Sequence, residues 1–322
     1  MSKKLITVTV PVYNEKENIR AAYERISAVM RTLEAYDYEI VFYDDGSADG
    51  SREEIEALCG QDPRVKAVFY TRNFGYSKNV FYCMQQARGD AAVIIHCDLQ
   101  NPPETIPAFV EKWERGADVV LGVKSKSREN KFAYFLRTLC YMIANLVFGM
   151  KLTPHSTEFE LFDRSFLDVL CRVRTAAPFL RGLVLEYAGH IEKVYYEQDK
   201  RARGKSHFSL SKYYTFAMEA MACTGRRLPR LMMLFSLAGV LALALEFFIR
   251  VLPDCGELGG EALFTGLLLR FGVFLLLLLL QTGALLFEYL IFLSKNREEK
   301  PLILEEKRLN FPASDPQTGE CL

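Results

Sequence analysis

The sequence predicts an α/β fold in which a mostly parallel sheet is followed by two hydrophobic helices. Short apolar runs alternate with helical patterns from residue 5 to residue 122, and this alternation is typical of a parallel sheet with helices on both faces. Two longer apolar runs follow Pro229, and each reaches the ~20 residues that a helix needs to span a bilayer. The formal net charge is zero, which argues against a nucleic-acid partner.

Five runs are expected to form strands, and the segments between them are expected to form helices. The strand-like runs are 5–10, 39–43, 65–70, 92–97 and 118–122, and the helical segments are 15–33, 51–59, 76–88 and 104–115. The fourth run is short enough for a buried strand and delivers His96, Cys97 and Asp98 to its carboxyl end. Pro102 and Pro103 then stop this strand and prepare the start of a helix.

Polar residues follow the carboxyl ends of these strands, the edge at which open parallel sheets bind ligands. The segments are PVYNE (11–15), YDDGSAD (43–49), RNFG (72–75), HCDLQNPPE (96–104) and GVK (122–124). From the residues alone, Asn14, Asp49 and Ser51 are equally well explained as helix-capping or turn residues. Each segment is a weak signal by itself, and the signal lies in their order along the chain.

In this order the segments resemble those of family 2 glycosyltransferases of the dolichol- and polyprenyl-phosphate sugar transferase type. DLQNPPE (98–104) is similar to the family's D-x-D-L-Q-x-P-P-E segment, and the likeness covers residues 5–230. The resemblance implies a GT-A fold, which is a Rossmann-like nucleotide-sugar domain. It also implies an inverting enzyme that moves a sugar from a UDP- or GDP-linked donor to polyprenyl (undecaprenyl) phosphate, for cell-envelope glycan or lipid modification.

The resemblance also implies which residues bind the donor, the metal and the acceptor. The implied nucleotide-sugar residues are Pro11, Tyr13, Glu15, Asp45, Asp98, Gln100, Lys124 and Arg201. A divalent cation, Mn²⁺ or Mg²⁺, is implied on Asp98 and Gln100. The implied acceptor-phosphate residues lie in a basic loop similar to the family's R-x-x-G-x-S-K and are Arg201, Arg203, Lys205 and His207. Asp98, Lys124 and Arg201 are the implied catalytic residues, with Lys124 where relatives usually have Arg.

The sequence departs from the family at His96, which stands where the family has the first Asp of the metal-binding segment. Neutral imidazole can bind Mn²⁺ but suits Mg²⁺ poorly, because hard cations prefer oxygen ligands. Three hypotheses follow. The metal is held by Asp98, Gln100 and the donor diphosphate; or His96 joins a Mn²⁺ site; or the site is degenerate and the protein is a membrane-anchored, non-catalytic or altered-specificity binding homologue.

A second departure lies in EFELFDR (158–164), which resembles the acceptor-side F-R-L-x-x-R segment that an Asp precedes in the family. That Asp is absent here, and Glu160 stands in the Arg position. A lipid phosphate is already charged and needs no general base, whereas a hydroxyl nucleophile does. The lost Asp therefore favours a lipid-phosphate acceptor, and a glycolipid hydroxyl stays open with Glu158 or Glu160 as its base.

Charges around the two apolar runs predict their orientation. The runs are 231–252 and 263–293, the loop between them is acidic, and Lys or Arg flank both outer ends. By the positive-inside rule both outer ends face the cytoplasm. We therefore expect a multi-pass protein of the plasma (inner) membrane with a cytoplasmic catalytic domain. Residues 131–150 are expected to form an interfacial helix, although an ordinary core helix fits the same pattern.

Three regions are expected along the chain. Residues 1–225 form the cytosolic GT-A domain, residues 226–295 form the membrane domain, and residues 296–322 form a poorly ordered cytosolic tail. The eight cysteines are scattered without a C-x-x-C pair, which favours reduced thiols in a cytosolic domain. We also expect the protein to be a homo-oligomer.

Overall fold

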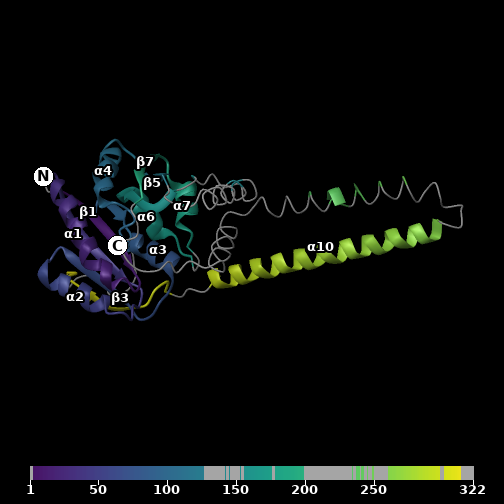
Figure 1. Ribbon diagram of the computed structural model, residues 1–322, viewed down its shortest axis with the longest axis horizontal. Coiled ribbons are helices and arrows are strands. Elements are labelled where there is room, and N and C mark those ends of the chain that lie inside the picture. The colour runs from purple at the N-terminus through teal and green to yellow at the C-terminus, as the bar shows by residue number, and fades with distance from the viewer. Residues whose placement is uncertain are drawn as a thin grey trace.

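An eight-stranded sheet forms the centre of a layered α/β domain (Figure 1). The computed structural model describes residues 3–126, 153, 156–175, 178–198, 260–297 and 301–312, with positions 142, 145, 234, 237–239, 241, 242, 245 and 249 between them. Within these residues the strand order is β7-β5-β6-β4-β1-β2-β3-β8.

Six strands of this sheet run in one direction and two run against them. The six are β1 (Lys4–Val12), β2 (Tyr36–Asp44), β3 (Val65–Tyr70), β4 (Ala91–Ile94), β5 (Val119–Lys126) and β7 (Ile191–Glu197). The two are β6 (Ser156–Asp163), between β4 and β5, and β8 (Glu305–Leu309), along β3. The five expected strands and the mostly parallel sheet are confirmed, whereas the sequence patterns missed β6, β7 and β8.

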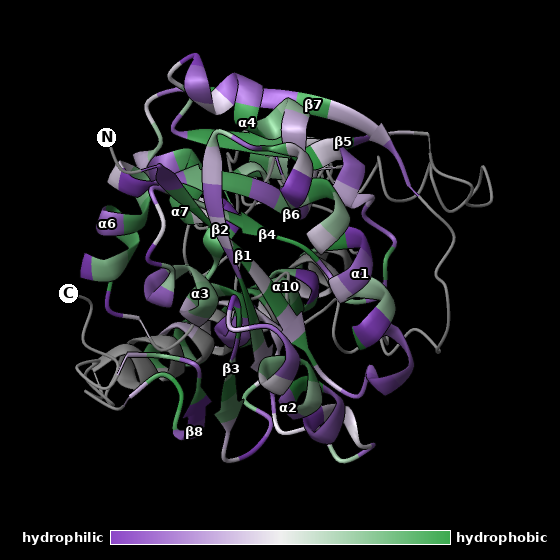
Figure 2. Ribbon diagram, turned by 90° about the vertical axis from the view of Figure 1, so that its left-hand side faces the viewer, coloured by the Kyte–Doolittle hydropathy of each residue, from purple (hydrophilic) through white to green (hydrophobic). Residues whose placement is uncertain are grey.

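Helices cover both faces of the sheet. One face carries α1 (Lys16–Thr32), α2 (Ser51–Gln61) and the 3-10 turn η1 (Pro103–Thr105) with α4 (Ile106–Glu114). The other face carries α3 (Tyr76–Gln86), α6 (Arg164–Arg172) and α7 (Leu180–Tyr187). The four expected helices are confirmed. Figure 2 shows the central strands in the colour of hydrophobic residues and both kinds of residue alternating along the helices.

The two faces are built by the alternation of side chains along each strand. On β2, Ile40 and Phe42 belong to the core under α1, α2 and α4, whereas Val41 and Tyr43 belong to the core under α3, α6 and α7. Helix α1 packs against the first of these two cores through Ile19 and the other buried residues that follow it at helical spacing. Parallel strands buried on both faces therefore read as the continuous apolar runs seen in the sequence.

The chain beyond residue 300 corrects one prediction. We expected residues 296–322 to be poorly ordered, and this is wrong for residues 301–312, where β8 pairs with β3. Ile303 is buried in the core beneath α3, and the side-chain amide of Asn310 donates to the carbonyl oxygens of Cys59 and Val65, each at 2.7 Å. A charged segment resembles a solvated tail, but the open edge of β3 offers it backbone partners.

A single long helix, α10 (Gly260–Arg297), extends away from the sheet (Figure 1). Its segment Phe264–Gly283 is long and apolar enough to cross a membrane, and it is the one such helix among the described residues. Most of the other predicted membrane run, 231–252, lies outside the described residues, as do most of the predicted interfacial helix 131–150 and the basic loop with Arg201, Arg203, Lys205 and His207.

Candidate functional site

The turn after β1 is locked to the turn after β2. The backbone N–H of Asn14 donates to Ser47 Oγ at 2.8 Å, and the backbone N–H of Ala48 donates to Asn14 Oδ1 at 2.9 Å. Asn14 has a positive φ of 54°, a conformation that Asn tolerates better than most residues. Asn14 therefore joins two loops, and Glu15 instead occupies the N-cap position of α1.

Tyr13 stands at the exposed end of this turn. Its side chain is 42% exposed, which leaves its ring open for stacking on a planar ligand. Pro11 is buried inside β1, paired with Tyr43 of β2. Pro11 can therefore act on a ligand only by fixing the position of the turn that carries Tyr13 and Glu15.

Asp45 ties the turn after β2 to the loop before α3. The backbone N–H groups of Phe74 and Gly75 donate to its two carboxylate oxygens at 2.7 and 3.0 Å. Burial raises the pKa of Asp45 to about 6, and these two donors act in the opposite direction. A Cβ on Gly46 would lie 2.6 Å from the backbone of Arg72, so only glycine permits this approach of the two loops.

The turn after β4 presents His96, Asp98 and Gln100. Leu99 has a positive φ of 57°, which is uncommon for a bulky side chain and marks a tightly bent turn. The backbone N–H of Gln100 donates to Asp98 Oδ1 at 3.1 Å. The side-chain oxygen of Gln100 accepts from Gln198 Nε2 at 3.1 Å, which ties this turn to the end of β7.

His96 is engaged with Tyr76 at the start of α3. Its Nε2 lies 3.2 Å from the Tyr76 hydroxyl, and the two rings stack with centroids 5.6 Å apart and 20° between their planes. A metal at Nε2 would have to displace the Tyr76 hydroxyl. This geometry disfavours the hypothesis that His96 is a metal ligand through that nitrogen.

Asp98 and Gln100 provide the oxygen donors that a hard divalent cation prefers. Among the described residues no group of three or more His, Cys, Asp or Glu side chains is arranged to hold a metal. The donor set therefore fits a cation that takes its other ligands from a bound diphosphate and water, and Asp98 would be the carboxylate among the protein's ligands. This is the first of the three hypotheses for the metal.

Lys124 lies near the carboxyl end of β5, at the edge of the sheet that also carries the turns after β1, β2 and β4. Its neighbour across the pair is Tyr196 of β7. The Tyr196 hydroxyl donates to Asn101 Oδ1 at 2.8 Å and lies 2.7 Å from Thr157 Oγ1. This buried hydrogen-bond chain fixes the end of β7 and the start of β6 against the turn after β4.

A cluster of charged residues lies on the α3 and α7 face of β6, next to the end of β4. Glu160 pairs with Ile94, is 1% exposed, and has an Oε2 atom that meets no hydrogen-bond donor among the residues described. Burial raises the pKa of Glu160 to about 8; Arg181 lowers it and Glu158 raises it. Arg181 Nε lies 3.4 Å from Glu158 Oε1. Burial of its hydroxyl, and then the charge of Glu158, raise the pKa of Tyr76, although the residue as a whole is 39% exposed.

The structure therefore gathers Tyr13, Glu15, Asp45, Asp98, Gln100 and Lys124 at one edge of the sheet. Sequence reasoning did not identify Tyr76 and Arg181 as part of this edge, and of the two Asp residues in YDDGSAD it chose Asp45 over Asp44. Asp44 is 1% exposed and ends β2 beside Asp45. The repeated Asp in the sequence was the available signal, and only the tertiary structure shows that both side chains are buried.

Comparisons with known proteins agree with this arrangement. An uncharacterized glycosyltransferase of Bacillus subtilis (strain 168), YkcC, is 31% identical over 308 residues, covering 94% of this chain and 93% of its own. An undecaprenyl-phosphate 4-deoxy-4-formamido-L-arabinose transferase of Pseudomonas fluorescens (strain SBW25) is 28% identical over 263 residues, covering 80% and 77%. A bactoprenol glucosyl transferase of Shigella phage SfV is 33% identical over 217 residues, covering 67% and 70%.

The crystal structure of glucosyl-3-phosphoglycerate synthase from Mycobacterium tuberculosis in complex with phosphoglyceric acid has the same fold. It covers 69% of this chain and 80% of its own, with a TM-score of 0.51 and 20% sequence identity. The family model for glycosyl transferase family 2 matches residues 7–187, more than half of the chain. The chain therefore belongs to glycosyl transferase family 2, and it is a glycosyltransferase with a GT-A, Rossmann-like α/β fold and a mixed sheet.

Proposed function

We propose that this glycosyltransferase moves a sugar, with inversion, from a UDP- or GDP-linked donor to a polyprenyl phosphate, undecaprenyl phosphate in a bacterium. The observation that carries the proposal is the junction of a nucleotide-sugar fold with α10, whose apolar segment Phe264–Gly283 suits a bilayer. Two relatives named for undecaprenyl-phosphate or bactoprenol transfer add support. The acceptor would then meet the donor at the membrane surface.

The strand β8 supports a two-helix membrane domain. Helix α10 ends at Arg297 and β8 begins at Glu305, inside the same sheet as the N-terminal strands. Both ends of the chain's membrane region must therefore return to one side of the bilayer, which requires an even number of crossings. If α10 crosses once, a second crossing must come from residues 199–259, and the apolar run 231–252 is long enough for it.

The positive-inside rule predicts which side of the membrane the outer ends of the two-helix domain face. Lys295 and Arg297 end α10, and Arg226, Arg227 and Arg230 precede the earlier run. An excess of Lys and Arg marks the cytoplasmic side of a membrane protein. We therefore propose a multi-pass plasma-membrane protein with its catalytic domain in the cytoplasm.

A phosphate acceptor also suits the acidic cluster on β6. Glu160 is mainly protonated at neutral pH because burial raises its pKa to about 8, and Glu158 faces Arg181. Neither carboxyl group is a ready general base. A phosphate oxygen of the lipid can attack the anomeric carbon directly, while the bond from that carbon to the diphosphate breaks and its electron pair leaves with the nucleotide.

The residues of this chain would then position and stabilise rather than transfer protons. In the proposal, Tyr13 stacks on the base, and the turn held by Asp45 shapes the nucleoside pocket. Lys124 and Arg201 bind phosphate oxygens, and Arg203, Lys205 and His207 bind the lipid phosphate. Asp98 and Gln100 hold the divalent cation, Mn²⁺ or Mg²⁺, which when bound neutralises charge on the departing diphosphate.

The test is a transfer assay with the purified full chain in detergent. A panel of UDP- and GDP-sugars is offered to undecaprenyl phosphate and, as the matched control, to undecaprenol, which has a hydroxyl in place of the phosphate. We expect a glycosylated lipid from the phosphate alone, with Mn²⁺ or Mg²⁺ and not with chelator. Equal transfer to undecaprenol would overturn the phosphate proposal and favour a hydroxyl acceptor.

A further inference from the structure

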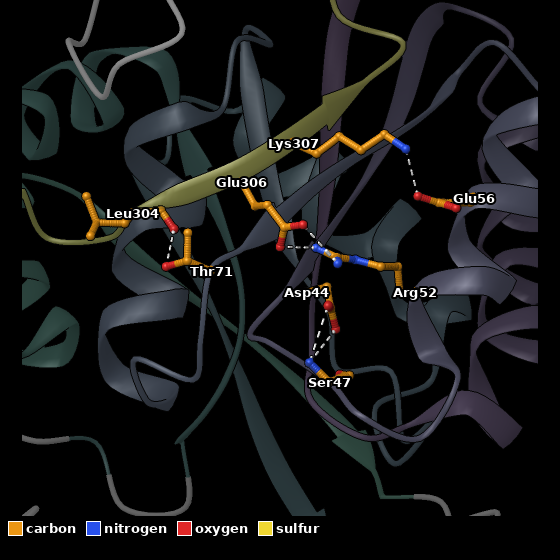
Figure 3. Close-up of polar contacts among 8 residues, drawn as sticks. All are labelled: Asp44, Ser47, Arg52, Glu56, Thr71, Leu304, Glu306 and Lys307. Atoms are coloured by element: carbon orange, nitrogen blue, oxygen red, sulfur yellow. Dashed lines mark hydrogen bonds and ion pairs between the residues drawn. The ribbon is translucent and has the colours of Figure 1, made fainter.

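The strand that follows the membrane helix contains a bulge. Along the pair of β3 and β8, Phe69 faces Lys307 and Tyr70 faces Glu305, so Glu306 has no partner opposite it on β3. Bulges twist a strand and redirect the side chain of the extra residue. Figure 3 shows the carboxylate of Glu306 facing the guanidinium of Arg52, with the two Nη atoms donating at 3.2 and 2.7 Å.

Arg52 lies in the helix that follows the turn after β2. It is in the first turn of α2, which begins at Ser51, one residue after the DDGSAD segment (44–49). Its guanidinium also lies over the ring of Phe69, 4.8 Å from the ring centroid. Two contacts therefore hold this cation, and the Glu306 contact comes from the far end of the chain.

The charge of Arg52 acts on Asp44, the buried carboxyl group at the end of β2. Burial raises the pKa of Asp44, while the N–H and hydroxyl groups of Ser47 and then the charge of Arg52 lower it. The backbone N–H of Ser47 approaches the Asp44 oxygens at 3.3 and 3.4 Å, and Ser47 Oγ in turn accepts from Asn14. The pKa of Asp44 is raised overall, and Arg52 offsets part of that effect of burial. Asp44 in turn holds Ser47 of the turn after β2.

The same tail also holds the loop before α3. The backbone N–H and the hydroxyl of Thr71 both donate to the carbonyl oxygen of Leu304, at 3.0 and 3.3 Å (Figure 3). Three residues later, Phe74 and then Gly75 donate to Asp45. The tail therefore contacts the loop before α3 directly, and it contacts Arg52 in the first turn of α2, the helix that follows the turn of Asp45.

We propose that Glu306 is a positioning residue for the donor nucleotide. It holds Arg52, and Arg52 orders the turn of Asp44 and Asp45. Strand β8, which follows α10, therefore supports the donor site without touching the donor. Glu306 does not touch the substrate. The inference rests on the proposed function only in taking this edge as the nucleotide site.

The test compares Glu306→Gln with Lys307→Gln in the full chain. Lys307 makes a similar ion pair from β8 to α2, with Nζ 2.9 Å from Glu56 Oε1, but it does not reach Arg52. We expect Glu306→Gln to raise the donor KM about three- to tenfold with kcat within about twofold, and Lys307→Gln to change neither. Equal effects of the two variants would make Glu306 a merely structural residue and overturn the proposal.

Exchanging the two charges tests whether the Arg52–Glu306 ion pair positions the turn of Asp44 and Asp45 or only attaches β8 to α2. In the double variant Arg52→Glu with Glu306→Arg, the ion pair between β8 and α2 is restored but a negative group stands beside Asp44. We expect the melting temperature to recover relative to Arg52→Glu alone, while the donor KM stays raised. Recovery of the donor KM as well would mean that the pair only attaches the tail, and the proposal would be wrong.

Hydrogen exchange provides a readout that needs no substrate. Without nucleotide, Glu306→Gln should speed amide exchange at Ser47, Phe74 and Gly75 at least about threefold, whereas Lys307→Gln should not. If the wild-type chain binds neither UDP nor GDP, the proposed function fails while this measurement still decides the role of Glu306. Unchanged exchange in Glu306→Gln, with nucleotide binding intact in the wild type, overturns the inference alone.

Discussion

At the scale of single residues, the side chains that could bind a metal are those that are not already engaged in other contacts within the protein. His96 is stacked on Tyr76 and shares a hydrogen bond with it, at the position where the resemblance to the family implies a carboxylate. Asp98 is then the carboxylate left in the HCDLQ segment. The role that we propose for Asp98 can be separated from nucleoside binding, because Tyr13 and Asp45 lie on other strands.

Asp98→Asn keeps the shape of the side chain and removes its charge. We expect kcat to fall by about 10²-fold or more, the size seen when one group that stabilises developing charge is removed, while the affinity for UMP or GMP changes less than about twofold. Steady-state kinetics and calorimetry measure the two quantities. As a companion, His96→Asp should shift the preference from Mn²⁺ toward Mg²⁺ only if His96 contacts the metal. Full wild-type activity in chelator, unchanged in Asp98→Asn, would remove the metal from the proposed function.

Glu160 should make stability depend on pH. Its pKa is raised to about 8 in the folded protein, so its contribution to stability is fully present below its unfolded pKa, near 4.3, and is lost as the pH rises through 8. Glu160→Gln removes this titration, and we expect the variant to gain melting temperature relative to the wild type between pH 6 and pH 9. Parallel curves for the two proteins across this range would contradict the burial argument.

The same variant tests the acceptor. If lipid phosphate is the nucleophile, Glu160→Gln and Glu158→Gln should each keep turnover within about tenfold of the wild type, because no general base is required. A loss of ~10²–10⁴-fold in either variant, with donor binding intact, is the size expected for a general base. That outcome would favour a glycolipid hydroxyl as the acceptor.

At the scale of elements, β8 is part of the domain rather than an appendage. Asn310 adopts a positive φ of 60° and donates to two carbonyl oxygens, which closes the loop between α2 and β3 against the end of β8. Phe311 lies under the guanidinium of Arg308, 5.3 Å from the ring centroid. These contacts explain why a strand with the sequence EEKRL is ordered.

Asn310→Ala should therefore destabilise the catalytic domain. The variant loses two hydrogen bonds of about 0.5–1.5 kcal/mol each and places a Cβ residue in a left-handed conformation at a cost of about 1–2 kcal/mol. Asn310→Gly is the matched control, because it loses the same hydrogen bonds without that strain. We expect thermal melting temperatures in the order wild type, Asn310→Gly, Asn310→Ala. A melting temperature for Asn310→Ala equal to that of the wild type would mean that β8 is dispensable.

At the scale of the whole molecule, the sheet constrains the membrane topology that we propose. Because β8 pairs with β3, the chain must leave the domain and return to it, so the acidic loop 253–261 should face away from the cytoplasm. Labelling of Cys255 by a membrane-impermeant thiol reagent in intact cells measures this, with the partly exposed Cys171 of the catalytic domain as the cytoplasmic control. Protection of Cys255 until the membrane is permeabilised would reverse the proposed orientation.

Much of the fold was readable in the sequence because it depends on local patterns. Buried parallel strands produce short apolar runs, and the helices between them carry apolar residues at helical spacing. The turns at the strand ends, from Tyr13 to Gln100, were found in the same way, since polar residues directly after such runs must lie at one edge of the sheet. These properties are carried by neighbouring residues, so the sequence by itself determined them.

Only the tertiary structure decided the features that depend on distant residues. Glu158 and Glu160 look like surface residues in the sequence, but β6, which lies between β4 and β5, buries Glu160 and leaves Glu158 only partly exposed. His96 meets Tyr76 only because the first residue of α3 lies beside the turn after β4. The segment EEKRL becomes a strand because the open edge of β3 supplies hydrogen-bond partners more than two hundred residues away in the sequence. Backbone pairing and burial are decided by what lies alongside a segment, and the segment's own residues do not encode that neighbour.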